Sequence, residues 1–162
     1  MNHKPSIIVV GIGNTLRGDD GIGWYAVDQL ADAINNKDIE FLKCRELMPE
    51  ISEKISKAKY VLFIDADSES VNGQVNETYI TPIESYPSLE THQLDPAGLL
   101  AFSTALYGNT PKAVMLTTRG ESFEYGEKLS EAVREAAQSL ISRAHAKLNE
   151  WCQNLQPKSC SF

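Results

Sequence analysis

The stretch that decides the fold is SIIVVGIGNTLRGDDGIG, residues 6–23. It opens with a run of β-branched residues that ends in glycine, which predicts a strand buried on both faces. The glycine-rich loop that follows carries two adjacent aspartates, Asp19 and Asp20, and leads into apolar residues at helical spacing from Ile22 to Ile34. A buried strand, a loop and an amphipathic helix are typical of the first unit of an α/β sheet.

The rest of the chain alternates in the same way. The patterns predict further strands at 39–44, 60–64, 74–80 and 113–116, and further helices at 49–58, 95–107 and 130–151. We therefore predict an α/β fold, a three-layer sandwich. Its core is a five-stranded, mostly parallel, twisted sheet with helices on both faces and one antiparallel strand.

The order of these elements predicts which loops meet. Right-handed crossovers place the second strand on one side of the first strand and the third strand on its other side. Only about seven residues, 66–72, separate the third and fourth strands, which is too short for a helical crossover, so these strands should be antiparallel. Residues 82–91 can span roughly 33 Å and return the chain to the first end of the sheet. This path brings His92 to the loops after the first and third strands.

Composition limits the classes of function. The 162 residues carry 42% hydrophobic and 23% charged side chains, which predicts one globular domain, 1–162, with 155–162 as a flexible tail. The net charge of -7 argues against a nucleic-acid partner, and no apolar run approaches the roughly 18 residues that cross a membrane. Three cysteines, Cys44, Cys152 and Cys160, without CxxC spacing favour a reducing compartment, and we expect a cytoplasmic protein.

Three polar residues stand where the predicted loops converge. They are Asp20 after the first strand, Asp65 at the end of the third strand, and His92 before the helix that begins near Asp95. Two carboxylates and an imidazole suit a divalent metal of intermediate hardness. Each residue also has a structural explanation, since an aspartate can cap a helix and a single histidine is more often structural than a ligand.

Other site types are less compatible with the sequence. The dinucleotide fingerprint G-x-G-x-x-G fails because its third glycine position is Leu16, and a phosphate-binding Gly-Lys-Ser/Thr is absent from the sequence. Asp19 is expected to cap the following helix while Asp20 faces the cleft. Arg17 and Arg119 are placed in loops at the same end, where they could meet a carboxylate of a partner or remain surface charges.

Taken together, the residues resemble the hydrogenase maturation proteases, a family of nickel-dependent endopeptidases. The resemblance runs from Ile7 to about Leu148 and rests on three motifs in order: GIGNTLRGDDGIG, IDA at 64–66 and HQL at 92–94. HQLDP at 92–96 further resembles the branch that serves NAD-coupled bidirectional hydrogenases. One departure is RELMPE at 45–50, where many members have an aspartate-glycine-glycine-threonine-like segment associated with substrate recognition.

The resemblance implies a site and a substrate. By position, the metal-binding and catalytic residues fall on Asp20, Asp65 and His92. The implied substrate is the precursor of a hydrogenase large subunit, which carries the nickel and loses a short C-terminal extension. The implied protein is a cytoplasmic monomer that holds no nickel permanently and binds neither nucleic acid nor membrane.

Three alternatives remain open from the residues alone. One is a metal-independent aspartic peptidase in which Asp20 and Asp65 share a proton. A second is a nickel chaperone that uses the same residues without cutting. A third is a nucleotide-binding module on a doubly wound sheet, which the failed glycine fingerprint disfavours.

Overall fold

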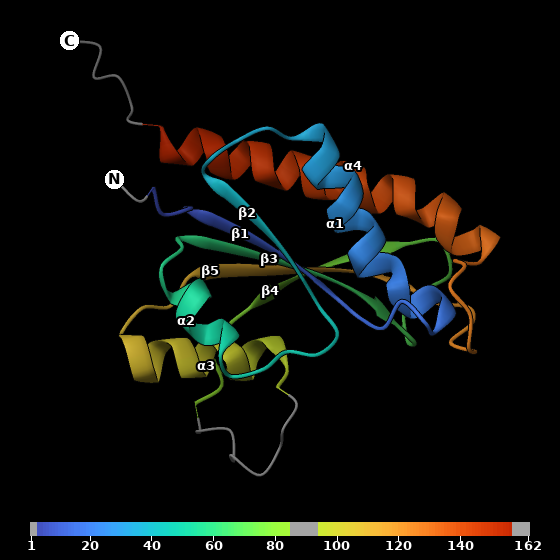
Figure 1. Cartoon of the computed structure of the whole chain (residues 1–162), viewed down its shortest axis with the longest axis horizontal. Coiled ribbons are helices and arrows are strands. Elements are labelled where there is room, and N and C mark those ends of the chain that lie inside the picture. Colours follow the sequence, from blue (N-terminus) through green and yellow to red (C-terminus); the bar gives the residue numbers. More distant parts are fainter. Residues whose placement is uncertain (1–2, 85–93, 157–162) are drawn as a thin grey trace.

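The computed structural model describes residues 3–84 and 94–156. In these residues a five-stranded sheet has the strand order β2-β1-β3-β5-β4 (Figure 1). The strands are β1 (Ile7–Ile12), β2 (Ile39–Cys44), β3 (Tyr60–Asp67), β4 (Val75–Ile80) and β5 (Lys112–Arg119). The helices are a 3-10 turn η1 (Gly18–Gly21), α1 (Ile22–Ala33), α2 (Ile51–Ser56), α3 (Pro96–Tyr107) and α4 (Glu131–Leu155). The predicted fold class is confirmed.

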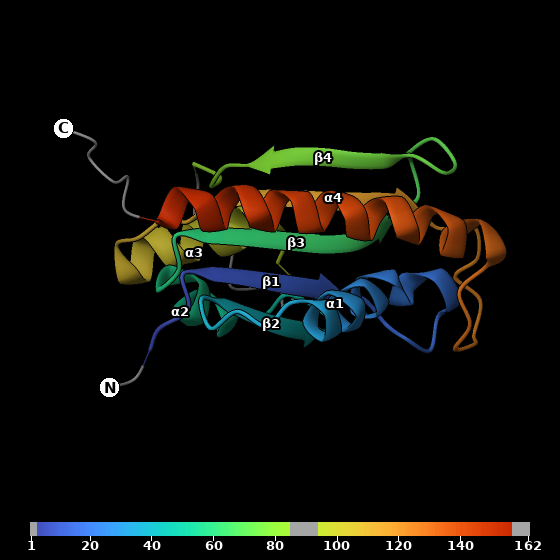
Figure 2. The same cartoon turned by 90° about the horizontal axis from the view of Figure 1, so that it is seen from above.

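The helices form layers on both faces of the sheet. Helices α1 and α4 lie on one face, and α2 and α3 lie on the other (Figures 1 and 2). Successive residues of a strand point to opposite faces. In β1, Ile7 and Val9 pack under α1 and α4, whereas Ile8 and Val10 pack under α2 and α3. Because both faces are covered, β1 is buried along its whole length, as its unbroken apolar run predicts.

The antiparallel strand is β4, as the short connection after β3 predicts. It does not pair with β3, however, because β5 lies between them, parallel to β3 and antiparallel to β4. The apolar residues of β5 need neighbours on both sides, whereas β4 alternates between exposed and half-buried positions and suits an edge.

Two glycines set the distance between α1 and the sheet. A β-carbon at Gly23 would lie 2.5 Å from the carbonyl oxygens of Ile12 and Ile64, and one at Gly11 would lie 2.4 Å from the carbonyl oxygen of Gly23. Any side chain at these positions would push the helix away. The glycines therefore fix the start of α1 over the carboxyl ends of β1 and β3.

Several boundaries differ from those predicted. Strand β3 continues to Asp67 and β5 to Arg119, so Asp65 lies inside a strand and Arg119 is not in a loop. These polar ends stay paired because backbone ladder hydrogen bonds do not depend on apolar side chains. Helix α4 runs on to Leu155, and α2 begins at Ile51. No helix among the described residues has the length and apolarity that a membrane span requires.

Candidate active site

The candidate site lies at the carboxyl end of the central strands. Asp65 lies on the face of β3 that α2 and α3 cover. It lines a pocket of about 440 Å³ together with Ile12, Leu47 and Met115. Glu46, Leu94, Asp95 and Pro96 complete the lining. This is the crevice where open α/β sheets bind ligands, because neighbouring connections leave in opposite directions there.

Asp65 is held in a way that disfavours its charge. Burial raises the pKa of its carboxyl group to about 7, a backbone hydrogen bond from Ala66 counteracts this, and the nearby carboxylates of Asp20 and Asp67 raise the pKa again. The Ala66 N–H donates to Oδ1 at 2.8 Å. A carboxyl group with a pKa near neutrality can take up or release a proton under ordinary conditions, which is what a general acid or base requires.

Asp20 lies in η1, two residues before the start of α1. Its Oδ2 accepts a hydrogen bond of 2.7 Å from the N–H of Asn14, which belongs to the loop after β1. That loop passes close to Asp20 because Gly13 has φ of 138°, and a β-carbon there would lie 1.9 Å from the Asp20 carbonyl oxygen. Asp20 is half-buried, and its charge affects the pKa of Asp65, so the two carboxylates are electrostatic neighbours.

His92, the third predicted residue, lies outside the described residues. The chain that follows it is described, and the backbone N–H of Leu94 donates to the carbonyl oxygen of Leu47 at 3.2 Å. Asp95 then caps α3 through a 2.7 Å hydrogen bond from Gly98 N–H, as predicted. Leu94 and Asp95 line the pocket of Asp65, so the chain does return to this end of the sheet.

The described residues include two of the ligands that a metal site would need. Among residues 3–84 and 94–156, no three histidine, cysteine, aspartate or glutamate side chains converge as a metal site would require. Asp20 and Asp65 supply two carboxylates, which are suitable ligands for a divalent ion of intermediate hardness but an incomplete set.

Asp19 has a structural role, but not the predicted one. Its carboxylate caps neither η1 nor α1. Instead it is fully buried and accepts four hydrogen bonds: from the backbone N–H groups of Glu121, Ser122 and Ser130 and from the Ser130 hydroxyl. Burial alone would raise the pKa of Asp19, but these bonds outweigh it and the pKa is lowered. The distant partners explain why local sequence could not reveal this role.

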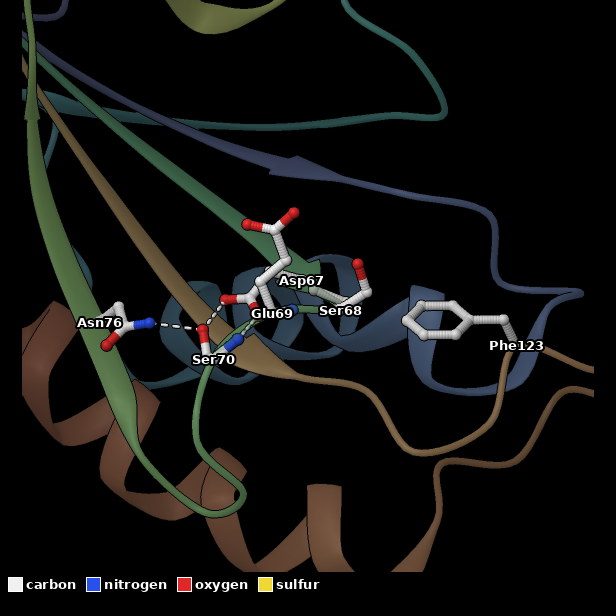
Figure 3. A pocket seen from close by; sticks show the side chains of 7 residues that line it. Asp67, Ser68, Glu69, Ser70, Asn76 and Phe123 are labelled. Atoms are coloured by element: carbon white, nitrogen blue, oxygen red, sulfur yellow. Dashed lines mark hydrogen bonds between the residues drawn. The ribbon is translucent and has the colours of Figure 1, made fainter.

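Sequence reasoning missed a second polar pocket at the end of β3. Asp67, Glu69, Ser70, Asn76 and Phe123 line it, with Ala66 and Ser68 (Figure 3). The side chain of Asp67 accepts a hydrogen bond from the Ser70 hydroxyl, which in turn accepts one from the Asn76 amide. Burial raises the pKa of Asp67, but bonds led by the one from Ser70 lower it overall, so this carboxylate is stabilised as an anion.

Two other residues near the site have their roles defined by contacts. Burial raises the pKa of the Cys44 thiol to about 11, and the charge of Asp65 adds to the effect, so the thiol is neutral. The Cys44 carbonyl accepts hydrogen bonds from Gly13 N–H at 3.0 Å and from the Trp24 indole at 3.0 Å. Arg119 donates to the Ser70 carbonyl at 3.2 Å and stabilises the turn after β3.

Several solved structures are similar to this fold. A doubly wound sheet with paired carboxylates at its carboxyl end defines a class of α/β proteins with an acidic crevice. Within that class, the structure is similar to those of hydrogenase maturation proteases, the family that the three motifs resemble. No protein-family model and no curated protein matches the sequence.

Three of the similar structures illustrate the match. A [NiFe] hydrogenase maturation protease, HycI, from Thermococcus kodakarensis shares 25% identity at a TM-score of 0.71, over 88% of this chain and 92% of that one. The hydrogenase maturating endopeptidase HybD from Escherichia coli shares 23% identity at a TM-score of 0.71, over 89% and 92%. A hydrogenase 2 maturation peptidase from a thaumarchaeote shares 21% identity at a TM-score of 0.65, over 88% and 97%. The enzymes in this comparison are hydrolases.

Proposed function

We propose that the chain is an endopeptidase that removes a C-terminal extension from the nickel-loaded precursor of a hydrogenase large subunit. The observation that carries the proposal is the half-buried carboxyl group of Asp65, whose pKa is raised to about 7. It lies at the carboxyl end of the central strands and interacts electrostatically with Asp20. The similar structures that bear the names of hydrogenase maturation proteases supply the substrate class.

In this proposal Asp20, Asp65 and His92 approach the nickel that the precursor already holds. Two carboxylates and one imidazole leave coordination positions for the substrate's own ligands, so a precursor without nickel would dock poorly. The metal polarises the scissile carbonyl or activates water, and the carboxylates of the chain orient the reacting groups. The NAD-coupled branch, a cytoplasmic location, a monomeric state and one domain over 1–162 belong to the same proposal.

A second candidate is an aspartic peptidase that needs no metal. It is favoured by the electrostatic coupling of Asp65 to Asp20, because two neighbouring carboxyl groups can share a proton and activate water. The two candidates differ in what they require of the precursor and of His92.

The test is a cleavage assay with purified precursor, prepared metal-free and nickel-loaded, and read out by mass spectrometry. Cleavage of only the nickel-loaded form, with loss of binding in His92→Ala, is expected. Equal cleavage of both forms would refute the nickel requirement and support the aspartic peptidase. Tight binding of loaded precursor without any cleavage would support a nickel chaperone instead.

A further inference from the structure

A third pocket, of about 660 Å³, adjoins the loop after β1. Arg17 and Arg45 line it from two different loops, together with Asn14, Leu16, Phe123 and Tyr125. Its connection with the candidate site is short, because Asn14 is the residue whose N–H donates to Asp20. A peptide bound at Asp20 could therefore extend directly into this pocket, which we call the arginine pocket.

The charge of the arginine pocket contrasts with that of the molecule. The chain has a net charge of -7, and the neighbouring crevice is lined by Glu46, Asp65 and Asp95. Within the part of the chain that the structure describes, no carboxylate lies within ion-pair distance of either guanidinium, although Glu124 also contributes to the lining. Two guanidinium groups in one pocket favour a carboxylate ligand, which arginine can bind with two parallel hydrogen bonds.

The pocket also offers apolar surface beside these charges. Leu16 is 40% exposed and Tyr125 is 88% exposed, and the half-buried Phe123 also lines the pocket. Large apolar side chains that stay exposed next to a functional crevice mark a binding surface more often than isolated ones do. The combination suits a peptide with an apolar side chain close to a carboxylate.

The walls of the arginine pocket are held in place by the backbone. Gly126 N–H donates to the Leu16 carbonyl at 2.8 Å, and Gly18 N–H donates to the Gly126 carbonyl at 2.7 Å. Arg17 Nε donates to the Phe123 carbonyl at 3.2 Å, which orients its guanidinium. The buried Asp19 carboxylate joins the same two loops through its bonds to residues 121, 122 and 130. The side of the pocket that Arg17 and Phe123 form is thus preorganised before any ligand arrives.

We propose that the arginine pocket binds a carboxylate of the peptide substrate together with an adjacent apolar side chain, and so selects the segment that is cut off. The inference rests on the proposed endopeptidase function and adds a specificity determinant to it. Arg45 comes directly after β2 and supplies one of the two guanidinium groups that line the pocket.

The test uses short peptides and no hydrogenase, so that it is independent of cleavage. Acetyl-Ala-Ala-Leu-Ala with a free carboxyl terminus, the same peptide amidated, and amidated acetyl-Ala-Leu-Asp-Ala are titrated into the full chain by isothermal titration calorimetry. The free acid, the aspartate peptide or both should bind at least about tenfold more tightly than the neutral amide. The first and third arms distinguish a chain terminus from an acidic side chain, and the second is the neutral reference for both.

Variants then assign the binding to the arginine pocket. Arg45→Glu should weaken binding of the acidic peptides about tenfold or more, and Arg45→Gln should weaken it less. The matched control is Lys37→Glu, which makes the same change in net charge at the opposite end of β2 and should change nothing. Equal binding of the neutral peptide, no binding of any peptide, or equal losses in Arg45→Glu and Lys37→Glu would overturn the proposal. If the chain binds acidic peptides but never cleaves the precursor, the proposed endopeptidase function is wrong, whereas the proposed binding of carboxylates by the arginine pocket is supported.

Discussion

Asp19 and Asp65 are two carboxylates at the same end of one sheet, and their surroundings shift their pKa values in opposite directions. Asp19 is fully buried with four hydrogen-bond donors around it, and its pKa is lowered. Asp65 is partly buried with one backbone donor, from Ala66, and its pKa is raised to about 7. Burial raises both pKa values. Four donors reverse the effect at Asp19, whereas the single donor at Asp65 does not, and the charges of Asp20 and Asp67 raise the pKa of Asp65 further.

The difference in hydrogen bonding distinguishes a carboxylate that stabilises the fold from one that is suited to catalysis. A carboxylate that is saturated with donors has no capacity left for a ligand, so Asp19 joins two loops and stabilises the fold. A carboxyl group with few donors is costly to ionise and is relieved by a metal or a proton, so Asp65 is suited to react. The same contrast predicts how substitutions at the two positions should differ.

The largest effect is expected for cleavage after Asp65→Asn. The amide cannot act as a base and is a poor metal ligand, so the rate of precursor cleavage should fall about 1,000-fold or more. Fold and secondary structure should be retained, because Asn can still accept the hydrogen bond from Ala66. Mass spectrometry of the reaction products and circular dichroism of the variant measure the two parts. Residual cleavage within tenfold of wild type would remove Asp65 from the chemistry.

The next effect is a loss of stability in Asp19→Asn. One oxygen becomes an amide donor that faces a backbone or hydroxyl donor, so about 2–3 kcal/mol of unfolding free energy should be lost at pH 7. The melting temperature should fall by roughly 4–12 °C. Because the folded pKa of Asp19 is lowered, its stabilisation is present above about pH 4 and is lost as the pH falls through that lowered pKa.

The gap between wild type and Asp19→Asn should therefore narrow below about pH 4, which urea unfolding at several pH values would measure. Cleavage by the folded variant at low temperature should stay within a few-fold of wild type. Abolished cleavage in a stable, folded Asp19→Asn protein would assign Asp19 to the chemistry and break the comparison.

An effect of opposite sign is expected for the stability of Asp65→Asn. The folded pKa of about 7 exceeds the unfolded value near 4, so the native state holds a proton that the unfolded state has lost between these values. Wild-type stability from this group should decline as the pH rises from about 4 to 7. Asp65→Asn lacks the decline and should gain stability relative to wild type between pH 4 and pH 8, by about 1.4 kcal/mol for each unit by which the folded pKa exceeds the unfolded one. A constant difference across this range, measured by thermal unfolding, would contradict the raised pKa.

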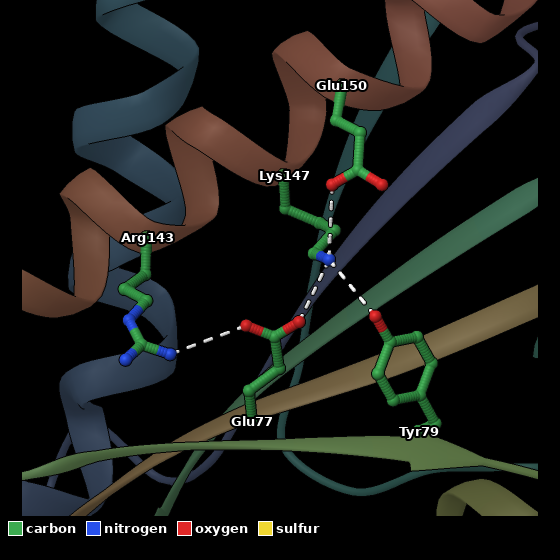
Figure 4. A network of polar contacts seen from close by, with 5 residues as sticks. All are labelled: Glu77, Tyr79, Arg143, Lys147 and Glu150. Atoms are coloured by element: carbon green, nitrogen blue, oxygen red, sulfur yellow. Dashed lines mark hydrogen bonds and ion pairs between the residues drawn. The ribbon is translucent and has the colours of Figure 1, made fainter.

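The smallest effect concerns a carboxylate on the other side of the sheet. Glu77 pairs with Lys147 at 2.9 Å and Arg143 at 3.4 Å, and Lys147 also contacts Tyr79 and Glu150 (Figure 4). Such partly exposed pairs contribute little, so Glu77→Gln should cost less than about 1 kcal/mol. Cleavage should be unchanged, because this network joins β4 to α4 and does not line the pocket of Asp65. A loss of cleavage would show that the outer strand affects the site.

The sequence by itself determined the elements and their order. Unbroken or alternating apolar runs predicted the five strands of the described residues, and apolar residues at helical spacing predicted the four main helices there. Strands that are buried on both faces have apolar side chains at successive positions, which the sequence shows directly. The short connection 66–72 predicted the antiparallel direction of β4, and Asp95-Pro96 predicted the start of α3. The three motifs predicted the fold family, and the similar structures confirm it.

Only the tertiary structure decided the roles of individual polar residues. Asp19 and Asp20 are neighbours in sequence, but one is bonded to residues more than 100 positions away and the other to Asn14. The insertion of β5 between β3 and β4 likewise depends on burial across the whole sheet. The arginine pocket combines loops from three parts of the chain, and Arg45 belongs to a segment that sequence alone could only mark as different. A carboxylate's hydrogen-bond donors and its burial come from the folded chain, and these fix whether it stabilises the fold or can react.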